Sequence, residues 1–171
     1  MSTELRIQSA TVRDVPLILQ FIKDLAEYER LAGAVVATEA DLREHLFGPD
    51  AVAHTVIAYL GDEPAGFALY FFNFSTFLAM PGLYLEDLFV KPSLRKRGIG
   101  RALLAYLAGI AVDRGCGRME WSVLNWNEQA LRVYRGIGAQ PLNEWTVMRL
   151  TGPAITALAA TAPAVPRSSA T

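Results

Sequence analysis

The sequence predicts a mixed α/β domain in which one sheet is flanked by helices. The chain has 171 residues, 52% of them hydrophobic and 19% charged, which is enough apolar material for one core. Short runs with strand-like alternation are interleaved with runs that have helical spacing, and Gly and Pro separate them. The predicted order is strand, two helices, three strands, helix, strand, helix and strand, which indicates a mixed sheet.

The first elements are a strand at 5–8 and two helices. A helix that begins at Thr11 or Asp14 and runs to about Tyr28 and Glu29 is predicted from the helical spacing of five apolar residues. These residues are Leu17, Ile18, Phe21, Ile22 and Leu25. Thr38 is followed three residues later by Asp41, which predicts a capped second helix that Gly48-Pro49 ends.

The remaining elements follow from turn signals and alternation. Strands are predicted at 52–60, 64–72, 83–90, 118–124 and 145–150. Helices are predicted at 99–114 and from Asn125 to Gly138. Gly61-Asp62-Glu63 joins the first two of these strands as a hairpin. Asn125, with Glu128 in the capping-box position, is predicted to cap the helix that Gly138 ends.

Composition excludes several classes of protein. One cysteine, Cys116, allows no intrachain disulfide, and with two histidines in the chain we expect no metal site. The net charge of −1 argues against a protein that coats nucleic acid. The first residues have no apolar leader, and the uncharged stretch 66–85 is interrupted by polar residues and Pro81-Gly82. We therefore expect a cytoplasmic protein without a membrane segment.

Charge is distributed unevenly along the chain. Residues 1–90 hold 13 acidic and 5 basic residues, whereas residues 91–171 hold 4 acidic and 11 basic residues. The balances of −8 and +7 fit either solvated faces or a cationic ligand on the first half and an anionic one on the second. From Thr151 onward the sequence is rich in Ala, Pro, Ser and Thr, so we expect one domain at 1–150 and a loosely ordered tail at 151–171.

The segment 95–104 contains the strongest local motif. Gly98 and Gly100 lie between a predicted strand and a predicted helix, where the backbone can approach a ligand and the helix offers unpaired N–H groups. Lys96, Arg97 and Arg101 add positive charge. This pattern favours a pyrophosphate, although the segment is neither a Walker loop nor a dinucleotide fingerprint.

This segment resembles the acetyl-coenzyme A signature of the GNAT N-acetyltransferases. Arg95-x-x-Gly98-x-Gly100 follows Leu85-Glu-Asp-Leu-Phe-Val90, and the similarity continues through 125–128 and 133–139. Within that superfamily the chain is most similar to the spermidine/spermine N-acetyltransferase branch and its thialysine-acetylating relatives. The resemblance implies a mostly antiparallel mixed sheet, split between the strands near 83–90 and 118–124, and a homodimer.

The resemblance also implies a binding site for acetyl-CoA as co-substrate. Its pantetheine arm would pair with the backbone of Leu88, Phe89 and Val90, as an added strand does. The diphosphate would lie on the loop that includes Ile99, and Asn127 matches a further contact. The complete set of implied cofactor-binding residues is Leu88, Phe89, Val90, Arg95, Lys96, Arg97, Gly98, Ile99, Gly100, Arg101, Asn127, Glu128 and Ala130.

Two catalytic residues are implied by the same resemblance. Tyr134 would act as the general acid for the departing thiolate, since a phenol has a pKa of about 10 and a thiol about 8.5. Glu86 would contact the substrate and relay a proton from the amine, whose ordinary pKa is about 10.4. Tyr28 and Glu29 match positions that bind substrate in the polyamine branch, and both groups suit an alkylammonium chain.

The neighbours Glu86 and Asp87 point to opposite faces of a regular strand, so they act together only if the strand is bulged. We expect acetyl transfer to a small cationic primary amine by direct attack, with no role for Cys116. The loop between Phe72 and Leu83 and the end of the chain depart from the polyamine enzymes, which leaves the amine open. Two alternatives are a non-catalytic acyl-CoA sensing module and an enzyme that acetylates a protein or peptide amine.

Overall fold

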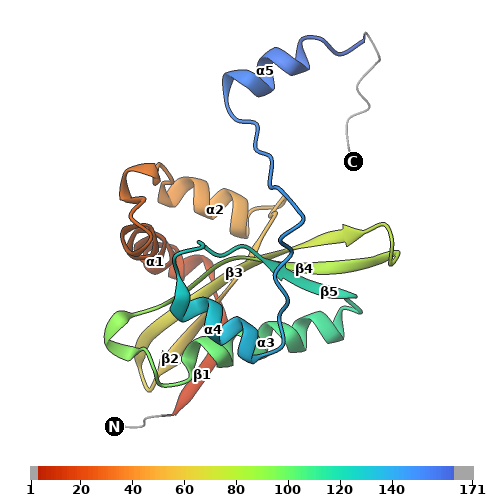
Figure 1. The fold of residues 1–171 in the computed structure, drawn as a ribbon. Helices are drawn as coiled ribbons and strands as arrows, with labels where there is room; N and C mark the ends of the chain where they lie inside the picture. Colours follow the sequence, from red (N-terminus) through yellow and green to blue (C-terminus); the bar gives the residue numbers. More distant parts are fainter. Residues whose placement is uncertain (1–3, 164–171) are drawn as a thin grey trace. The chain divides into compact units, whose positions relative to one another are not determined.

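A five-stranded sheet with the spatial order β1-β2-β3-β4-β5 organises the first part of the chain (Figure 1). The computed structural model describes residues 4–163. The strands are β1 (Leu5–Ser9), β2 (His54–Leu60), β3 (Glu63–Ser75), β4 (Met80–Val90) and β5 (Arg118–Trp121). Strands β1 to β4 pair in antiparallel fashion, and β5 runs parallel to β4. The predicted mixed and mostly antiparallel sheet is thereby confirmed.

The described residues form five α-helices. They are α1 (Val15–Tyr28), α2 (Glu39–Phe47), α3 (Ile99–Asp113), α4 (Glu128–Gly136) and α5 (Pro153–Ala159), with short 3-10 turns at 12–14, 32–34 and 92–94. Helices α1 and α2 lie on one face of the sheet, and α3 lies on the other (Figure 1). In the described part of the chain, no helix is both long enough and apolar enough to cross a membrane.

The core on the α1 face forms around Phe21. Its ring stacks on Phe67 of β3 at 5.4 Å between centroids and lies 6.0 Å from the ring of Phe89 on β4. Ile18 and Ile57 complete the contact, and both are fully buried. Aromatic pairs of this kind contribute about 0.5–1.5 kcal/mol beyond the burial of their area, so they fix α1 against the middle of the sheet.

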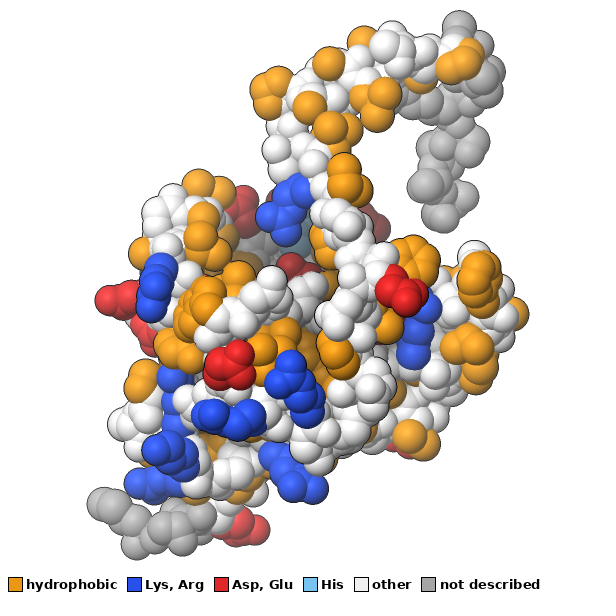
Figure 2. All heavy atoms as spheres, in the orientation of Figure 1, with side chains coloured by type: hydrophobic (Ala, Val, Ile, Leu, Met, Phe, Trp, Pro, Cys, Tyr) orange, Lys and Arg blue, Asp and Glu red, His pale blue; other side chains and the backbone are white. Residues whose placement is uncertain are grey.

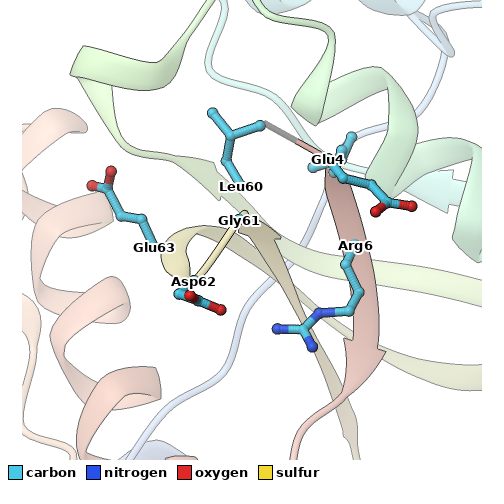
Figure 3. Close-up of a pocket in the computed structure, with 7 residues that line it drawn as sticks. Glu4, Arg6, Leu60, Gly61, Asp62 and Glu63 are labelled. Carbon is cyan, nitrogen blue, oxygen red and sulfur yellow. The ribbon is translucent and has the colours of Figure 1, made fainter. Parts of the chain in front are cut away.

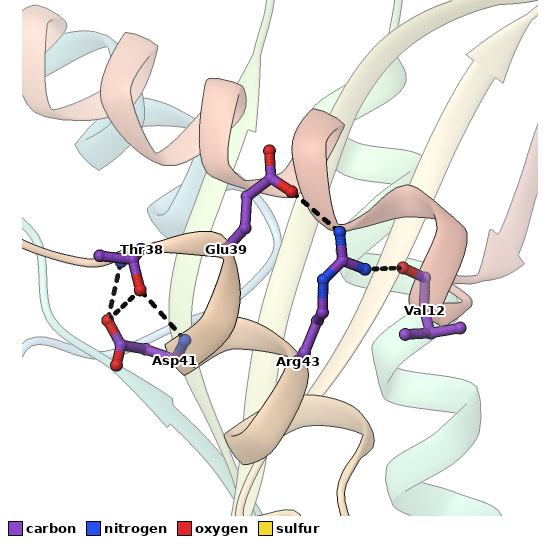
Figure 4. A network of polar contacts seen from close by, with 5 residues as sticks. All are labelled: Val12, Thr38, Glu39, Asp41 and Arg43. Carbon is purple, nitrogen blue, oxygen red and sulfur yellow. Dashed lines mark hydrogen bonds and ion pairs between the residues drawn. The ribbon is translucent and has the colours of Figure 1, made fainter.

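Helix α2 begins with the predicted capping box (Figure 4). The Thr38 hydroxyl accepts a hydrogen bond from the Asp41 backbone N–H, and the Asp41 carboxylate accepts one from the Thr38 backbone N–H. The Thr38 hydroxyl also donates to the Asp41 carboxylate, and this bond together with the one from the Thr38 backbone N–H keeps the pKa of Asp41 below its ordinary value, because both favour the charged form. Arg43 pairs with Glu39 at 2.8 Å and donates to the Val12 carbonyl, which joins α2 to the start of α1 (Figure 4).

The split in the sheet lies between β4 and β5. Their parallel pairing covers only Gly82–Leu85 against Arg118–Trp121, while β4 continues to Val90. The strand predicted at 118–124 is therefore three residues shorter than expected, and β4 from 86 to 90 has no strand partner on that side among the described residues. A second irregularity lies on the other side of β4, where Leu69 pairs with Asp87 but Tyr70 pairs with Leu85. Glu86 is thus the extra residue of a β-bulge.

The chain divides into two compact units, residues 1–131 and 132–171. In the second unit the predicted strand at 145–150 is wrong, because no residue of that segment pairs in a sheet. Its apolar alternation favours extended backbone, but a strand also needs a partner with free N–H and C=O groups. Residues 153–159 form α5, and part of the expected loose tail, 164–171, lies outside the described residues. The single domain at 1–150 stays a prediction.

The cap of α4 also differs from the prediction. The side-chain oxygen of Asn127, not that of Asn125, accepts a hydrogen bond from the Ala130 backbone N–H at 3.2 Å. Gly138 follows the helix with φ 91°, as predicted for the residue that ends it.

Candidate active site

The glycine loop before α3 has the backbone geometry of an anion-binding turn. Lys96 and Gly98 both have positive φ, 63° and 79°, and Gly98 is the N-cap residue of α3. A side chain at Gly100 would meet the side chains of Leu88 and Val90 at 3.8 Å, so this glycine lies directly beside the end of β4. The unpaired N–H groups of the first turn of α3 therefore face a loop without bulky side chains at either glycine.

The cations of this loop are solvent-exposed. Lys96, Arg97 and Arg101 are all in the exposed class, and Figure 2 shows Lys and Arg side chains gathered on the lower part of one face. Exposed cations at the start of a helix suit the phosphate groups of coenzyme A. Ile99, by contrast, is buried at 2% exposure and anchors the start of α3 in the core. These residues fit the diphosphate of the expected co-substrate.

Arg95 has a different position from the rest of the motif. Its Nε donates to the Val90 carbonyl at 3.0 Å, and its guanidinium lies 4.2 Å from the centroid of the Tyr28 ring. The guanidinium also lies 5.8 Å from the Phe89 ring. The side chain is half-buried in these contacts. Arg95 therefore joins the end of β4 to the end of α1, which motif spacing did not predict.

Tyr28 links three segments of the site. Its ring lies between Arg95 and Trp126, whose ring centroid is 6.0 Å away, and its hydroxyl donates to Asn127 Oδ1 at 3.4 Å. The guanidinium carbon of Arg30 lies over the ring of Trp126, 5.1 Å from its centroid. We call Arg30, Tyr28, Trp126, Arg95 and Asn127 the aromatic clasp. One face of Tyr28 is occupied by Arg95, so its contribution to substrate binding would come from the ring edge and the hydroxyl.

The backbone of β4 beyond the split offers an unpaired edge. Leu88, Phe89 and Val90 pair with β3 on one side, and the β5 pairing ends at Leu85 on the other. Phe89 and Val90 are buried and Leu88 is half-buried, so these three residues are firmly held. An amide-containing chain could add to this edge by backbone hydrogen bonds.

Three carboxylates lie together where α1 ends beside the bulge of β4. Burial, together with the nearby charges of Glu86 and Glu29, raises the pKa of Asp87 to about 6. Burial also raises the pKa of Glu29. Glu86 is exposed, at the extra position of the bulge. In a regular strand Glu86 and Asp87 would point to opposite faces, but the bulge allows both carboxylates to act at one place. Their charges give the end of α1 a negative electrostatic potential.

Asp87 is the residue that sequence reasoning missed. A regular strand would have turned it away from Glu86, and only the bulge changes that geometry. The signal available beforehand was two adjacent acids in the apolar run 83–90, since an acid in a buried strand needs a reason.

The other predicted residues lie on α4. Asn127 and Ala130 are joined by the helix cap, and Glu128 is exposed in the first turn. Tyr134 lies in the second unit, half-buried, and its backbone carbonyl accepts from the Ile137 and Ala139 N–H groups. In the described residues, no group of three or more His, Cys, Asp or Glu side chains is arranged to hold a metal ion.

A separate hollow lies at the opposite edge of the sheet (Figure 3). It is lined by Glu4, Leu5, Arg6, Leu60, Gly61, Asp62 and Glu63. No predicted site residue lines it, and its acids come from the start of β1 and the β2–β3 turn. We assign it no part in the candidate active site.

Comparison with known proteins matches most of the chain to one family. The model of the acetyltransferase (GNAT) family matches residues 19–139. The thialysine N-epsilon-acetyltransferase of Bos taurus is 37% identical over 164 residues, which cover 90% of this chain and 96% of that protein. The L-ornithine N5-acetyltransferase NATA1 of Arabidopsis thaliana is 34% identical over 198 residues, with coverage of 90% and 87%.

A solved structure supports the same architecture. An integron cassette protein from the mobile metagenome of V. cholerae superimposes with a TM-score of 0.76 at 29% identity, covering 93% of this chain and 98% of that one. Because the match extends over almost the whole of both chains, the fold implied by the motif resemblance is confirmed.

Proposed function

The chain belongs to the GNAT acetyltransferase family, and we propose that it transfers the acetyl group of acetyl-CoA to a primary amine of a small cationic molecule. The family match over 19–139 carries this proposal, since it spans the glycine loop, the split strands and α4. It favours an enzyme over the acyl-CoA sensing module, and an N-acetyltransferase over other reactions.

The first part of the mechanism is binding of the co-substrate. Acetyl-CoA supplies an activated thioester carbonyl. The first turn of α3 would hold its diphosphate with backbone N–H groups, and Lys96, Arg97 and Arg101 would neutralise its charge. The free edge of Leu88 to Val90 would hold the pantetheine amides, which places the reactive end near the bulge.

The second part is presentation of the amine. Glu29, Glu86 and Asp87 would create a negative potential that attracts an alkylammonium group. The ammonium must lose a proton before it can attack, and Glu86 would accept it, directly or through water; its exposed position beside the half-buried Asp87 supports this role. Tyr134 would donate a proton to the departing thiolate.

The relatives suggest which amines to test. Thialysine and L-ornithine, named for two relatives, are both amino acids with a second amine at the end of the side chain. We include polyamines as the other candidate class, because spermidine/spermine N(1)-acetyltransferase-like protein 1 of Homo sapiens is also similar, at 32% identity. A cytoplasmic location and a homodimer also belong to this proposal and follow from the sequence and the resemblance.

The direct test is thiol release from acetyl-CoA by purified protein with thialysine, ornithine, lysine, spermidine and putrescine. We expect turnover with one amine class, and Tyr134→Phe should lower kcat by about 10²-fold or more with little change in cofactor affinity. Cys116→Ala is the matched control, since direct attack needs no acetyl-cysteine, and it should retain turnover. Cofactor binding without thiol release on any amine would instead support a sensing module or a protein substrate. Equal, small effects of Tyr134→Phe on kcat and affinity would assign that residue to packing.

A further inference from the structure

A polar cluster lies on the face of the sheet that α1 covers, farther along β4 from the bulge at Glu86. Arg118 Nε pairs with Glu120 Oε2 at 2.9 Å, and Asn73 Nδ2 donates to the same carboxylate oxygen at 3.5 Å. The side chains of Arg118 and Glu120 are 38% and 29% exposed, so solvent and ligands can reach both. We call Asn73, Arg118 and Glu120 the zwitterion cluster.

The strand register places this cluster on the α1 face. Gly82 pairs with Asn73 and with Arg118, and Tyr84 pairs with Glu120, so these side chains share one face. Tyr84 stacks on Phe71 with ring centroids 5.1 Å apart, and its hydroxyl bonds to Ser122 at 3.0 Å. The intervening residues of β4, Leu83 and Leu85, are buried toward the other face at 0% and 2% exposure.

Asp87 lies on the same face as the cluster. It pairs with Leu69, a residue that packs against the core around Phe21 on the α1 side. Between Asp87 and Tyr84, which pairs with Glu120, the strand advances three residues with one in the bulge, which is about 7–10 Å. Gly82, which pairs with Arg118, lies two residues or about 7 Å farther along the strand, but the guanidinium of Arg118 lies beside Glu120 because its Nε pairs with that carboxylate. The charged groups of the cluster are thus separated from Asp87 along the strand by about the length of an extended basic amino acid.

The cluster keeps groups that could bind a ligand. The ion pair with Glu120 uses Arg118 Nε, and among the described residues the two terminal nitrogen atoms of the guanidinium have no partner. Those groups form the fork that binds a carboxylate by two parallel hydrogen bonds. Glu120 in turn can accept from an ammonium group.

The packing of the cluster depends on Gly82. A Cβ at that position would lie 2.3 Å from Asn73 Oδ1 and 3.3 Å from Arg118 Cγ, so the absent side chain makes room for both. Asn73 Oδ1 is buried without a hydrogen-bond partner among the described residues. Leaving a buried oxygen without a hydrogen bond costs stability, and a network that served structure alone would be expected to satisfy it. The unsatisfied oxygen therefore favours a functional role for the cluster.

We propose that Arg118 and Glu120 bind the α-carboxylate and α-ammonium groups of an amino-acid acceptor, and so select a basic amino acid over a diamine of the same length. The proposal rests on the acetyltransferase function proposed above and adds its specificity. Arg118 contributes the fork for the carboxylate, Glu120 contributes the acceptor for the ammonium, and the terminal amine extends toward Asp87 and Glu86. A diamine offers no carboxylate to Arg118 and so gains nothing from it.

The test uses acceptor pairs that differ only in the carboxylate: ornithine with putrescine, and lysine with cadaverine. The wild-type enzyme should have the higher kcat/KM for the amino acid of each pair. Arg118→Gln should lower kcat/KM for the amino acids by about 10- to 100-fold, the usual effect of losing charge-assisted hydrogen bonds, and leave the diamines unchanged. Glu120→Gln should lower kcat/KM for lysine more than for Nα-acetyl-lysine, which lacks the ammonium.

Arg6→Gln is the matched control, because Arg6 lies over Tyr59 at the opposite edge of the sheet, 5.1 Å from the ring centroid. It should change neither class of acceptor. An equal fall for amino acids and diamines in Arg118→Gln, or a wild-type preference for diamines, would overturn the inference. Absence of thiol release by the wild-type protein with every acceptor would instead overturn the proposed function. Diamine turnover in the variant reports on its folding, so a destabilised protein is recognised.

Discussion

Glu86 and Asp87 are adjacent in sequence but have different environments. Glu86 is exposed at the extra position of the bulge, whereas Asp87 is held in the sheet opposite Leu69. Burial therefore raises the pKa of Asp87 to about 6, and the charges of Glu86 and Glu29 act in the same direction. Keeping a carboxyl group in this place costs stability, and active sites commonly carry such a cost.

We predict that Asp87→Asn stabilises the protein at neutral pH and lowers its activity. The folded pKa of about 6 lies above the ordinary 3.8, so the unfavourable contribution is absent below about pH 4, grows as pH rises, and is complete above about pH 6. The shift corresponds to about 3 kcal/mol, so the variant should gain up to that amount over the wild type between pH 4 and 7.

Urea unfolding of both proteins at several pH values measures this difference. Asp62→Asn, on the exposed β2–β3 turn, is the control and should show no such trend. A stability difference that does not depend on pH would mean that Asp87 ionises normally.

At the level of elements, the shape of the loop before α3 is determined by backbone conformation more than by side-chain contacts. Gly98 has φ 79°, and an added Cβ there would meet nothing within 4 Å. The requirement for glycine is therefore conformational, and in the proposed complex its missing side chain would keep the approach to the helix N-terminus clear.

We predict that Gly98→Ala raises the KM for acetyl-CoA and destabilises the fold by about 1 kcal/mol, the usual cost of a left-handed alanine. Gly109→Ala is the matched control, because Gly109 lies inside α3 with nothing within 4 Å of the added Cβ. That substitution should stabilise the protein by about 0.5–1 kcal/mol and leave KM unchanged. Steady-state kinetics with urea unfolding measure both effects, and an unchanged KM in Gly98→Ala would remove the loop from the cofactor site.

The aromatic clasp joins three elements: the end of α1, the end of β4 and the start of α4. Arg95 stacks on Tyr28, and Tyr28 bonds to Asn127, which caps α4. Arg95, which immediately precedes the loop at 96–101, thus contacts the end of α1 through its guanidinium group.

We predict a coupling energy of about 1 kcal/mol between Arg95→Leu and Tyr28→Leu in urea unfolding, since each contact of this type contributes about that amount. Both single variants should also lower kcat/KM. The Arg6–Tyr59 pair, a second cation–π contact at 5.1 Å, is the control and should affect stability without affecting kcat/KM. Turnover unchanged in Arg95→Leu would show that the clasp is purely structural.

At the scale of the whole molecule, exposed apolar side chains gather at the end of the β3–β4 hairpin (Figure 2). They are Phe74, Phe77, Leu78 and Met80. Phe77 is 98% exposed, and a cluster of this kind favours association with another surface. The proposed homodimer offers a second copy of the chain for that role.

We predict that sedimentation velocity gives a dimer, and that replacing Phe77 and Leu78 together by Ser shifts it toward monomer. Val112→Ser is the control, because Val112 on α3 is also strongly exposed at 78%. A wild-type protein that sediments as a monomer at every concentration tested would contradict the dimer.

The sequence by itself predicted much of this protein, because the deciding forces were local. Apolar spacing predicted α1 and α3, the Thr38–Asp41 box predicted the start of α2, and Gly98 with Gly100 predicted the turn that opens α3. Each depends on residues within a few positions of one another, so the sequence alone contains the information.

Only the tertiary structure decided the features that depend on distant partners. The bulge that brings Asp87 beside Glu86 arises from pairing with β3, and the position of Arg95 over Tyr28 arises from segments 67 residues apart in sequence. The same reason explains the wrong strand at 145–150, since alternation favours extended backbone but cannot supply a hydrogen-bonding neighbour. Local pattern fixes what a segment can form, and its pairing and packing fix which side chains meet.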